Sequence, residues 1–260
     1  MTRWLPLALA LVLGSTVVVW AATTPEEVEE NQSLQTNIVT PHKPWACGHV
    51  NGPMRALFFV FAGHYGGEWD EPGTRLREVI ELGQRFDLQA DAILYSRSGE
   101  NWSFHGGRLG EDRARRLLAR PYQLYVIAGF PMEKLPGDIQ YAILERVVAG
   151  AGLVYCGDAR SDYLTDRRRI NPTPPALVAG LPRIENQVPA DVMSAYQLRG
   201  GRAVWLKYGA WALTPNAPFT WRGLMDYDYR MLLVGRAALW VAGKDSPIQI
   251  ASVAGDGPLT

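Results

Sequence analysis

Seven consecutive apolar residues, 56–62, are the sequence feature that most restricts the possible folds. In an antiparallel sheet with one face in water, apolar and polar residues alternate along each strand. An uninterrupted apolar run is instead typical of a parallel strand that helices cover on both faces. The run stops at Gly63, and a polar segment follows over 64–73. We therefore expect a central parallel strand with a loop at its carboxyl end.

The strand pattern is followed by a helix pattern, and this alternation is repeated along the chain. Apolar residues recur at helical spacing over 74–86, where Leu76, Val79 and Ile80 share one face. Further strands are predicted at 90–95, 122–128, 152–156 and 202–208, and further helices at 111–120, 138–149 and 224–242. Alternating strands and helices form β-α-β units around a parallel sheet. The sequence thus predicts an α/β domain over 55–244, a three-layer αβα fold with a mostly parallel, flavodoxin-like sheet.

Three segments fall outside this alternation. Residues 22–54 are polar and contain prolines, so we expect an N-terminal extended arm that lies over the domain. Residues 158–190 are rich in proline and are expected to form an irregular connection. Residues 245–260 are interpreted as a C-terminal tail or as the start of a further module.

The N-terminus has the pattern of an export signal. Arg3 precedes an apolar segment, 4–20, and the small residues Ala21 and Ala22 follow. This order predicts a signal peptide over 1–21 that is cleaved after Ala21, and hence a secreted or periplasmic protein. The alternative is that residues 4–20 stay uncleaved and anchor the protein, because their length is near the lower limit for a membrane span. We expect contact with a membrane only through this segment.

The charges are balanced, with 26 Lys and Arg against 26 Asp and Glu. Proteins that bind nucleic acid need a concentrated basic face, so this balance argues against a nucleic-acid partner. The densest basic cluster, 167–169, lies beside Asp162 and Asp166 and is interpreted as a solvated loop with local ion pairs. The sequence contains no compact set of metal-ligating residues, and we predict neither a metal nor a cofactor.

Cys156 closes the predicted strand at 152–156 and is followed by Gly157. A thiol at the tip of a parallel strand occupies the place of the nucleophile in several α/β hydrolases and amidotransferases. The four histidines of the chain all precede Cys156, and the last of them is His105. A catalytic base for this thiol therefore cannot come from the segment that follows it.

The span 146–157, Arg-Val-Val-Ala-Gly-Ala-Gly-Leu-Val-Tyr-Cys-Gly, resembles the helix, turn and strand that lead to the nucleophile of class I glutamine amidotransferase-like domains. Residues 199–206 and 226–244 resemble exported bacterial members of that superfamily. The resemblance implies a Cys nucleophile with a His and a Glu from near the end of the domain. The chain departs from that pattern, because Tyr155-Cys156-Gly157-Asp158 is not the usual Gly-x-Cys-x-Gly and no late histidine exists. We therefore expect a domain of this type without glutaminase chemistry.

The carboxyl ends of the predicted parallel strands meet at one edge, where open α/β sheets bind ligands. A rearranged catalytic set at this edge would consist of Cys156, His64 as base and Glu68 as its orienting acid. The candidate ligand-binding residues at the same edge are Tyr65, Asp70, Ser96, Phe130, Asp158 and Arg160.

Two hypotheses on function follow from these residues. The preferred one is a non-catalytic ligand-binding or assembly module, whose partner is a small molecule, a carbohydrate or a neighbouring domain. Aromatic residues in predicted loops, such as Trp69 and Trp102, favour this hypothesis because exposed rings stack on sugars and dominate interfaces. The alternative is a hydrolase or amidase that uses Cys156 as nucleophile and His64 as base.

Overall fold

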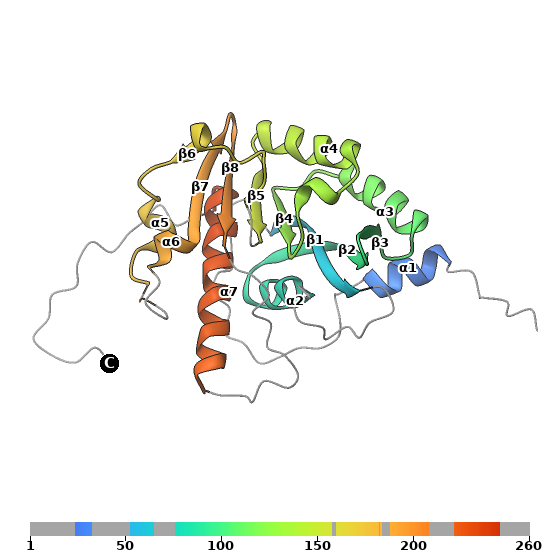
Figure 1. The fold of residues 1–260 in the computed structure, drawn as a ribbon, viewed down its shortest axis with the longest axis horizontal. Helices are drawn as coiled ribbons and strands as arrows, with labels where there is room; N and C mark the ends of the chain where they lie inside the picture. Colours follow the sequence, from blue (N-terminus) through green and yellow to red (C-terminus); the bar gives the residue numbers. More distant parts are fainter. Residues whose placement is uncertain are drawn as a thin grey trace, which may run out of the picture.

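One sheet organises the part of the chain that the structure describes (Figure 1). The computed structural model describes residues 24–32, 53–64, 76–157, 160–181, 183, 188–207 and 221–244. Within these residues the strand order of the sheet is β3-β2-β1-β4-β5-β8-β7-β6. The order places the long apolar run at 56–62, which belongs to β1, inside the sheet.

Five of the strands are parallel and form the middle of the sheet. They are β1 (Met54–His64), β2 (Leu88–Ser98), β4 (Leu124–Ala128), β5 (Gly152–Cys156) and β8 (Gly201–Leu206). Their pairing, β2-β1-β4-β5-β8, is the flavodoxin-like order in which the second strand lies on one side of the first and the later strands on the other. The predicted α/β fold class is confirmed.

Helices cover both faces of the sheet. Side chains of α2 (Leu76–Arg85), α5 (Pro175–Val178) and α7 (Trp221–Val241) pack in one core cluster. Side chains of α3 (Arg108–Leu118) and α4 (Gly137–Val148) pack in the other. Alternate residues of the central strands enter the two clusters, and Leu57, Phe58, Phe59 and Val60 of β1 are all fully buried. A continuous apolar run therefore suits this strand, because neither of its faces meets water.

Three antiparallel strands extend the sheet at its borders. They are β3 (Asn101–Phe104), which pairs with β2, and the strands β7 (Met193–Leu198) and β6 (Arg169–Ile170) beyond β8. The sequence patterns did not predict them. In the β7–β8 hairpin, Arg199 has a φ of 54° and is followed by Gly200, so the chain reverses in two residues. The region 158–190, expected to be irregular, contains β6, α5, the 3-10 turn η2 (Asp166–Arg168) and the start of α6 (Pro189–Val192).

The N-terminal part of the body differs from the prediction of an extended arm. Residues Pro25–Gln32 form a helix, α1, which packs against α3 and β2. Val28 and Gln32 of α1 are buried. A segment with four glutamates and one apolar residue gives a weak amphipathic signal, so the apolar pattern does not reveal the helix. The folded body therefore begins before the predicted boundary at residue 55.

Several predicted segments lie outside the described residues. They include the signal peptide at 1–21, most of the arm at 22–54 with Cys47, and the tail at 245–260. Among the helices that the structure describes, none is both long enough and apolar enough to cross a membrane.

Candidate ligand-binding site

The carboxyl ends of β1 and β4 are the point where the strand order reverses. β2 lies on one side of β1, and β4 lies on the other. Connections leave in opposite directions at such a point, and open α/β sheets bind ligands in the crevice that results. The candidate site therefore consists of the residues that end β1, β2 and β4 and of their neighbours.

Cys156 lies inside the core and not at an exposed turn. It is the last residue of β5, pairs with Ala128 and Leu206, and is 0% exposed. Its carbonyl accepts a hydrogen bond from the Gly129 amide at 3.0 Å, which continues the ladder of the sheet. A nucleophile elbow needs a strained backbone that lifts the side chain out of the sheet. Among described residues other than glycine, Arg199 alone has a positive φ, so Cys156 has an ordinary strand conformation.

The pairing register also separates His64 from Cys156. Val60, Ala128 and Cys156 form one row across β1, β4 and β5. His64 pairs with Arg97, three positions beyond the partner of Val60. With strands about 4.8 Å apart and a rise of about 3.3 Å per residue, the backbones of His64 and Cys156 are about 14 Å apart. The two backbones therefore lie in different rows of the sheet edge.

The other predicted site residues differ in where the structure places them. Tyr65, Glu68, Asp70 and Asp158 lie outside the described residues. Ser96 is buried within β2, which continues to Ser98, and it does not lie in a loop after the strand. Arg160 is exposed and forms an ion pair with the Asp166 carboxylate. Of the predicted ligand-binding residues, Phe130 is the one that the structure joins to a cluster at the carboxyl edge.

This cluster consists of aromatic rings from four elements of the sheet edge. The ring of Trp102 on β3 lies 5.7 Å from Phe61 at the end of β1 and 5.8 Å from Phe130 after β4. It is stacked on Tyr95 of β2 with a centroid distance of 5.9 Å and an interplanar angle of 16°. Such offset contacts between rings add to the free energy of burial. Trp102 remains partly exposed, whereas Phe130 is buried.

Strand pairing holds Trp102 in place. Arg97 of β2 pairs with His64 on one side and with Trp102 on the other, so these three residues form a row at the carboxyl edge. The Arg97 guanidinium lies 5.9 Å from the Trp102 ring centroid, at the outer limit for a cation–π contact. Trp102 was expected in a loop. Its strand could have been recognised from the alternation of polar and aromatic residues in Asn101-Trp102-Ser103-Phe104 after the turn at Gly99.

Polar contacts hold the loops after β4 and β5 together beside the cluster. The Glu133 carboxylate accepts hydrogen bonds from the Ser161 hydroxyl at 2.5 Å and from the Asp162 amide at 2.9 Å. The Tyr163 hydroxyl donates to the Gln140 side chain at 2.6 Å. These contacts fix the two loops relative to each other, so the rim of the sheet beside Phe130 is preorganised.

Tyr95 provides a test of how the aromatic cluster is buried. Its hydroxyl donates to the Lys134 carbonyl at 2.6 Å. Burial, and in second place the Glu111 carboxylate, raises the pKa of Tyr95 to about 12. The unfolded chain, in which tyrosine has a pKa of about 10, therefore loses this proton at a lower pH than the folded chain. The contribution of Tyr95 to stability is complete below pH ~10 and is lost as the pH rises to ~12.

We expect the free energy of unfolding to fall less steeply above pH ~10 in Tyr95→Phe than in the wild type. Urea denaturation at several alkaline pH values measures this slope. Tyr141→Phe, at the exposed tyrosine of α4, is the matched control and should retain the wild-type slope. Equal slopes in Tyr95→Phe and the wild type would contradict the burial of the Tyr95 hydroxyl.

Comparisons with known proteins add little to this geometry. No family model and no curated protein matches the chain. Among solved structures, a cytoplasmic protein of Salmonella typhimurium LT2 is similar over 72% of this chain and 99% of its own, with 10% identity and a TM-score of 0.43. A second cytoplasmic protein of Salmonella typhimurium is similar over 72% of this chain and 98% of its own, with 14% identity and a TM-score of 0.39. At these scores neither protein bears on the function of the chain.

Proposed function

We propose that this protein is an exported, non-catalytic module with a glutamine amidotransferase-like α/β fold, which binds a carbohydrate at the carboxyl edge of its sheet. The observation that carries the non-catalytic part is the position of Cys156. A thiol that is 0% exposed, within a regular strand, is not presented to a substrate. A thiolate also needs a neighbouring base or positive charge, and the register keeps the backbone of His64 distant.

The aromatic cluster supports the binding part of the proposal. Trp102 is partly exposed and lies at the carboxyl edge, close to the point where the strand order reverses. Its position is fixed by rings from β1, β2 and the loop after β4, so little side-chain entropy is lost when a ligand stacks on it. A pyranose ring presents an apolar face to such a surface, and Arg97 lies beside it as a donor for ring substituents.

The matched pair Trp102→Ala and Tyr141→Ala tests the binding part. Both remove an aromatic ring with access to solvent, but Tyr141 lies on α4, away from the cluster. A panel of neutral and acidic oligosaccharides is titrated into each protein by calorimetry. We expect the wild type to bind at least one of them, Trp102→Ala to bind it about tenfold more weakly, and Tyr141→Ala to bind it as the wild type does. Wild-type affinity in Trp102→Ala, or no binding in the wild type, would contradict the proposal.

A further inference from the structure

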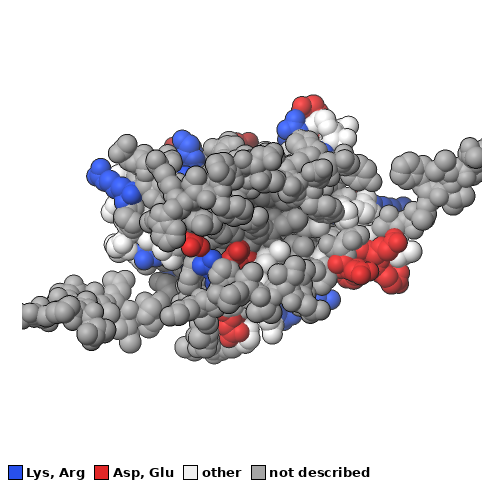
Figure 2. All heavy atoms as spheres, turned by 90° about the horizontal axis from the view of Figure 1, so that it is seen from below, with Lys and Arg blue, Asp and Glu red and all other residues white. Residues whose placement is uncertain are grey.

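The helix α1 depends on its contacts with the rest of the protein. It has eight residues, and its start is fixed by a capping box. In this box the Thr24 amide donates to the Glu27 carboxylate at 2.8 Å, and the Glu27 amide donates to the Thr24 hydroxyl at 3.2 Å. Helices of this length are marginal in water on their own. Figure 2 shows acidic side chains gathered at the α1 end of the molecule, where Glu26, Glu27 and Glu30 are exposed.

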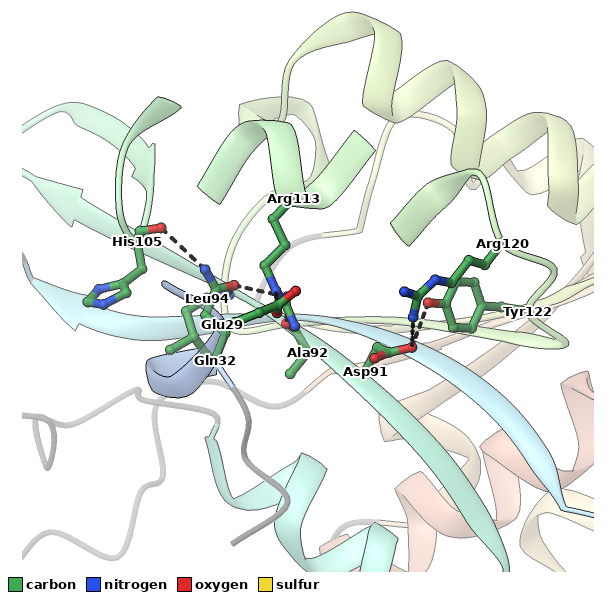
Figure 3. A network of polar contacts seen from close by, with 9 residues as sticks. All are labelled: Glu29, Gln32, Asp91, Ala92, Leu94, His105, Arg113, Arg120 and Tyr122. Carbon is green, nitrogen blue, oxygen red and sulfur yellow. Dashed lines mark hydrogen bonds and ion pairs between the residues drawn. The ribbon is translucent and has the colours of Figure 1, made fainter. Parts of the chain in front are cut away.

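The inner side of α1 holds the segment that follows β3. The Gln32 amide nitrogen donates to the carbonyl of His105, the first residue after β3, at 3.3 Å, and the Gln32 amide oxygen accepts from the Leu94 amide at 3.2 Å (Figure 3). Val28 packs on Gly106, because a Cβ added at Gly106 would lie 2.5 Å from Cγ2 of Val28. The φ of Gly106, +78°, also favours glycine.

Arg113 of α3 completes the attachment. Its guanidinium donates to the Ala92 carbonyl at 2.5 Å and to the Gln32 amide oxygen at 3.3 Å, and it forms an ion pair with Glu29 (Figure 3). The Arg113 side chain is 5% exposed, so its charge is stable there only with these partners. Ala92 and Leu94 belong to β2 and precede the residues that pair with β3. Gln32 and Arg113 therefore take the place of a neighbouring strand along this part of β2.

The same contacts act on the proposed ligand platform. β3 is a border strand of four residues that pairs with β2 on one side, and Trp102 lies two residues before its end. The exit of β3, residues 105–107, is held by the Leu94 carbonyl and by Val28 and Gln32 of α1. Loss of α1 would leave this exit with fewer contacts, and the mobility of a border strand rises when such contacts are lost.

We propose that α1 is a releasable strap that positions β3, so that docking of α1 and stacking of a ligand on Trp102 strengthen each other. The proposal deepens the proposed function and rests on it for the ligand. Coupling between two binding events is reciprocal. Release of α1 therefore lowers the affinity for the ligand by the same factor by which the bound ligand raises the affinity of α1 for its docking position. Removal of residues 24–32, by a protease or by a competing partner, would lower ligand affinity without a change at Trp102 itself.

The test releases α1 and follows β3 by two measurements. Val28→Asp and Gln32→Ala remove the inner contacts, and Glu30→Gln, at an exposed position of the same helix, is the matched control. Hydrogen exchange of amides 101–107 is measured without ligand, and oligosaccharide affinity is measured by calorimetry. We expect Val28→Asp to raise the exchange rates of amides 101–107 about tenfold and to weaken the oligosaccharide affinity about tenfold. The exchange rates of β4 and β5 should stay unchanged. Glu30→Gln should match the wild type in both measurements.

The outcomes separate this proposal from the proposed function. If the wild type binds no oligosaccharide, the proposed function fails, and the exchange of 101–107 still decides whether α1 positions β3. If α1 loses protection in Val28→Asp and residues 101–107 exchange as in the wild type, the strap is contradicted. If the exchange rises and the affinity stays at the wild-type value, the coupling is contradicted. Gln32→Ala gives the same comparison should Val28→Asp fail to fold.

Discussion

Replacement of Gly201 by alanine is expected to lower the free energy of unfolding by about 3 kcal/mol or more. Gly201 is the first residue of β8 and lies against the end of α4. A Cβ at this position would lie 1.9 Å from the Val147 carbonyl oxygen and 2.4 Å from that of Ala151. Both contacts are with backbone atoms, which cannot rotate away as a side chain can. The helix or the β7–β8 hairpin must therefore move, and the packing on that face of the sheet is lost.

Gly83→Ala is the matched control for this substitution. Gly83 lies within α2, and a Cβ added there would meet no atom within 4 Å. Because alanine favours the helix over glycine, this variant is expected to gain about 0.5–1 kcal/mol. Urea denaturation followed by circular dichroism measures both variants. A stability of Gly201→Ala within about 0.5 kcal/mol of the wild type would contradict the close approach of α4 to β8.

Arg113→Ala is expected to cost about 3 kcal/mol, the second largest effect that the structure predicts. The substitution removes the hydrogen bonds to Ala92 and Gln32 and the ion pair with Glu29. It also leaves the Ala92 carbonyl of β2 without the guanidinium that satisfies it, at a position where water has little access. The loss of the Glu29 pair contributes the smaller share, because Glu29 is itself 55% exposed.

Arg116→Ala provides the comparison on the same helix. Arg116 is exposed on α3, so its truncation is expected to change stability by less than about 0.5 kcal/mol. Thermal and urea denaturation of the two variants, measured side by side, give the difference. Equal stabilities would mean that the network around Arg113 in Figure 3 does not hold α1 and β2 together.

The middle of the fold could be predicted from the sequence because its strands are covered on both faces. Residues 56–62, 124–128 and 152–156 have no side that meets water, and their apolar runs are therefore uninterrupted. The predicted helices around them were found within a few residues of their observed bounds. Their apolar residues recur at helical spacing, as Ile139, Ile143 and Val147 do in α4.

The borders of the sheet could not be predicted in the same way. β3 and β7 are short antiparallel strands joined to their neighbours by tight turns, and the polar–aromatic alternation in β3 covers only four residues. α1 has Val28 as its buried apolar residue, and the polar Gln32 is buried with it. Gln32 is buried because of contacts with residues far away in the sequence, and such contacts cannot be recognised from the local sequence pattern.

The aromatic cluster lies at the sheet edge that Cys156 pointed to in the sequence, but Cys156 itself is buried. Cys156 is at the end of a parallel strand, as expected, but the alternation of side chains along β5 sends it into the core with Val154. The neighbouring side chain, Tyr155, enters the opposite cluster. Which of two adjacent residues faces which layer depends on the register of the sheet, and that register could not be read from one sequence. The aromatic cluster around Trp102 depends on β3, which was missed.

The alkylation rate of Cys156 tests the account most directly. In a Cys47→Ser background, iodoacetamide reacts with Cys156 alone among the two cysteines of the chain. A thiol packed within β5 should react near neutral pH far more slowly in the folded protein than in the urea-unfolded chain. An alkylation rate in the folded protein equal to or above that of the unfolded chain would reveal an accessible, activated thiol. This result would contradict the proposal that the protein binds a ligand without using Cys156 as a nucleophile.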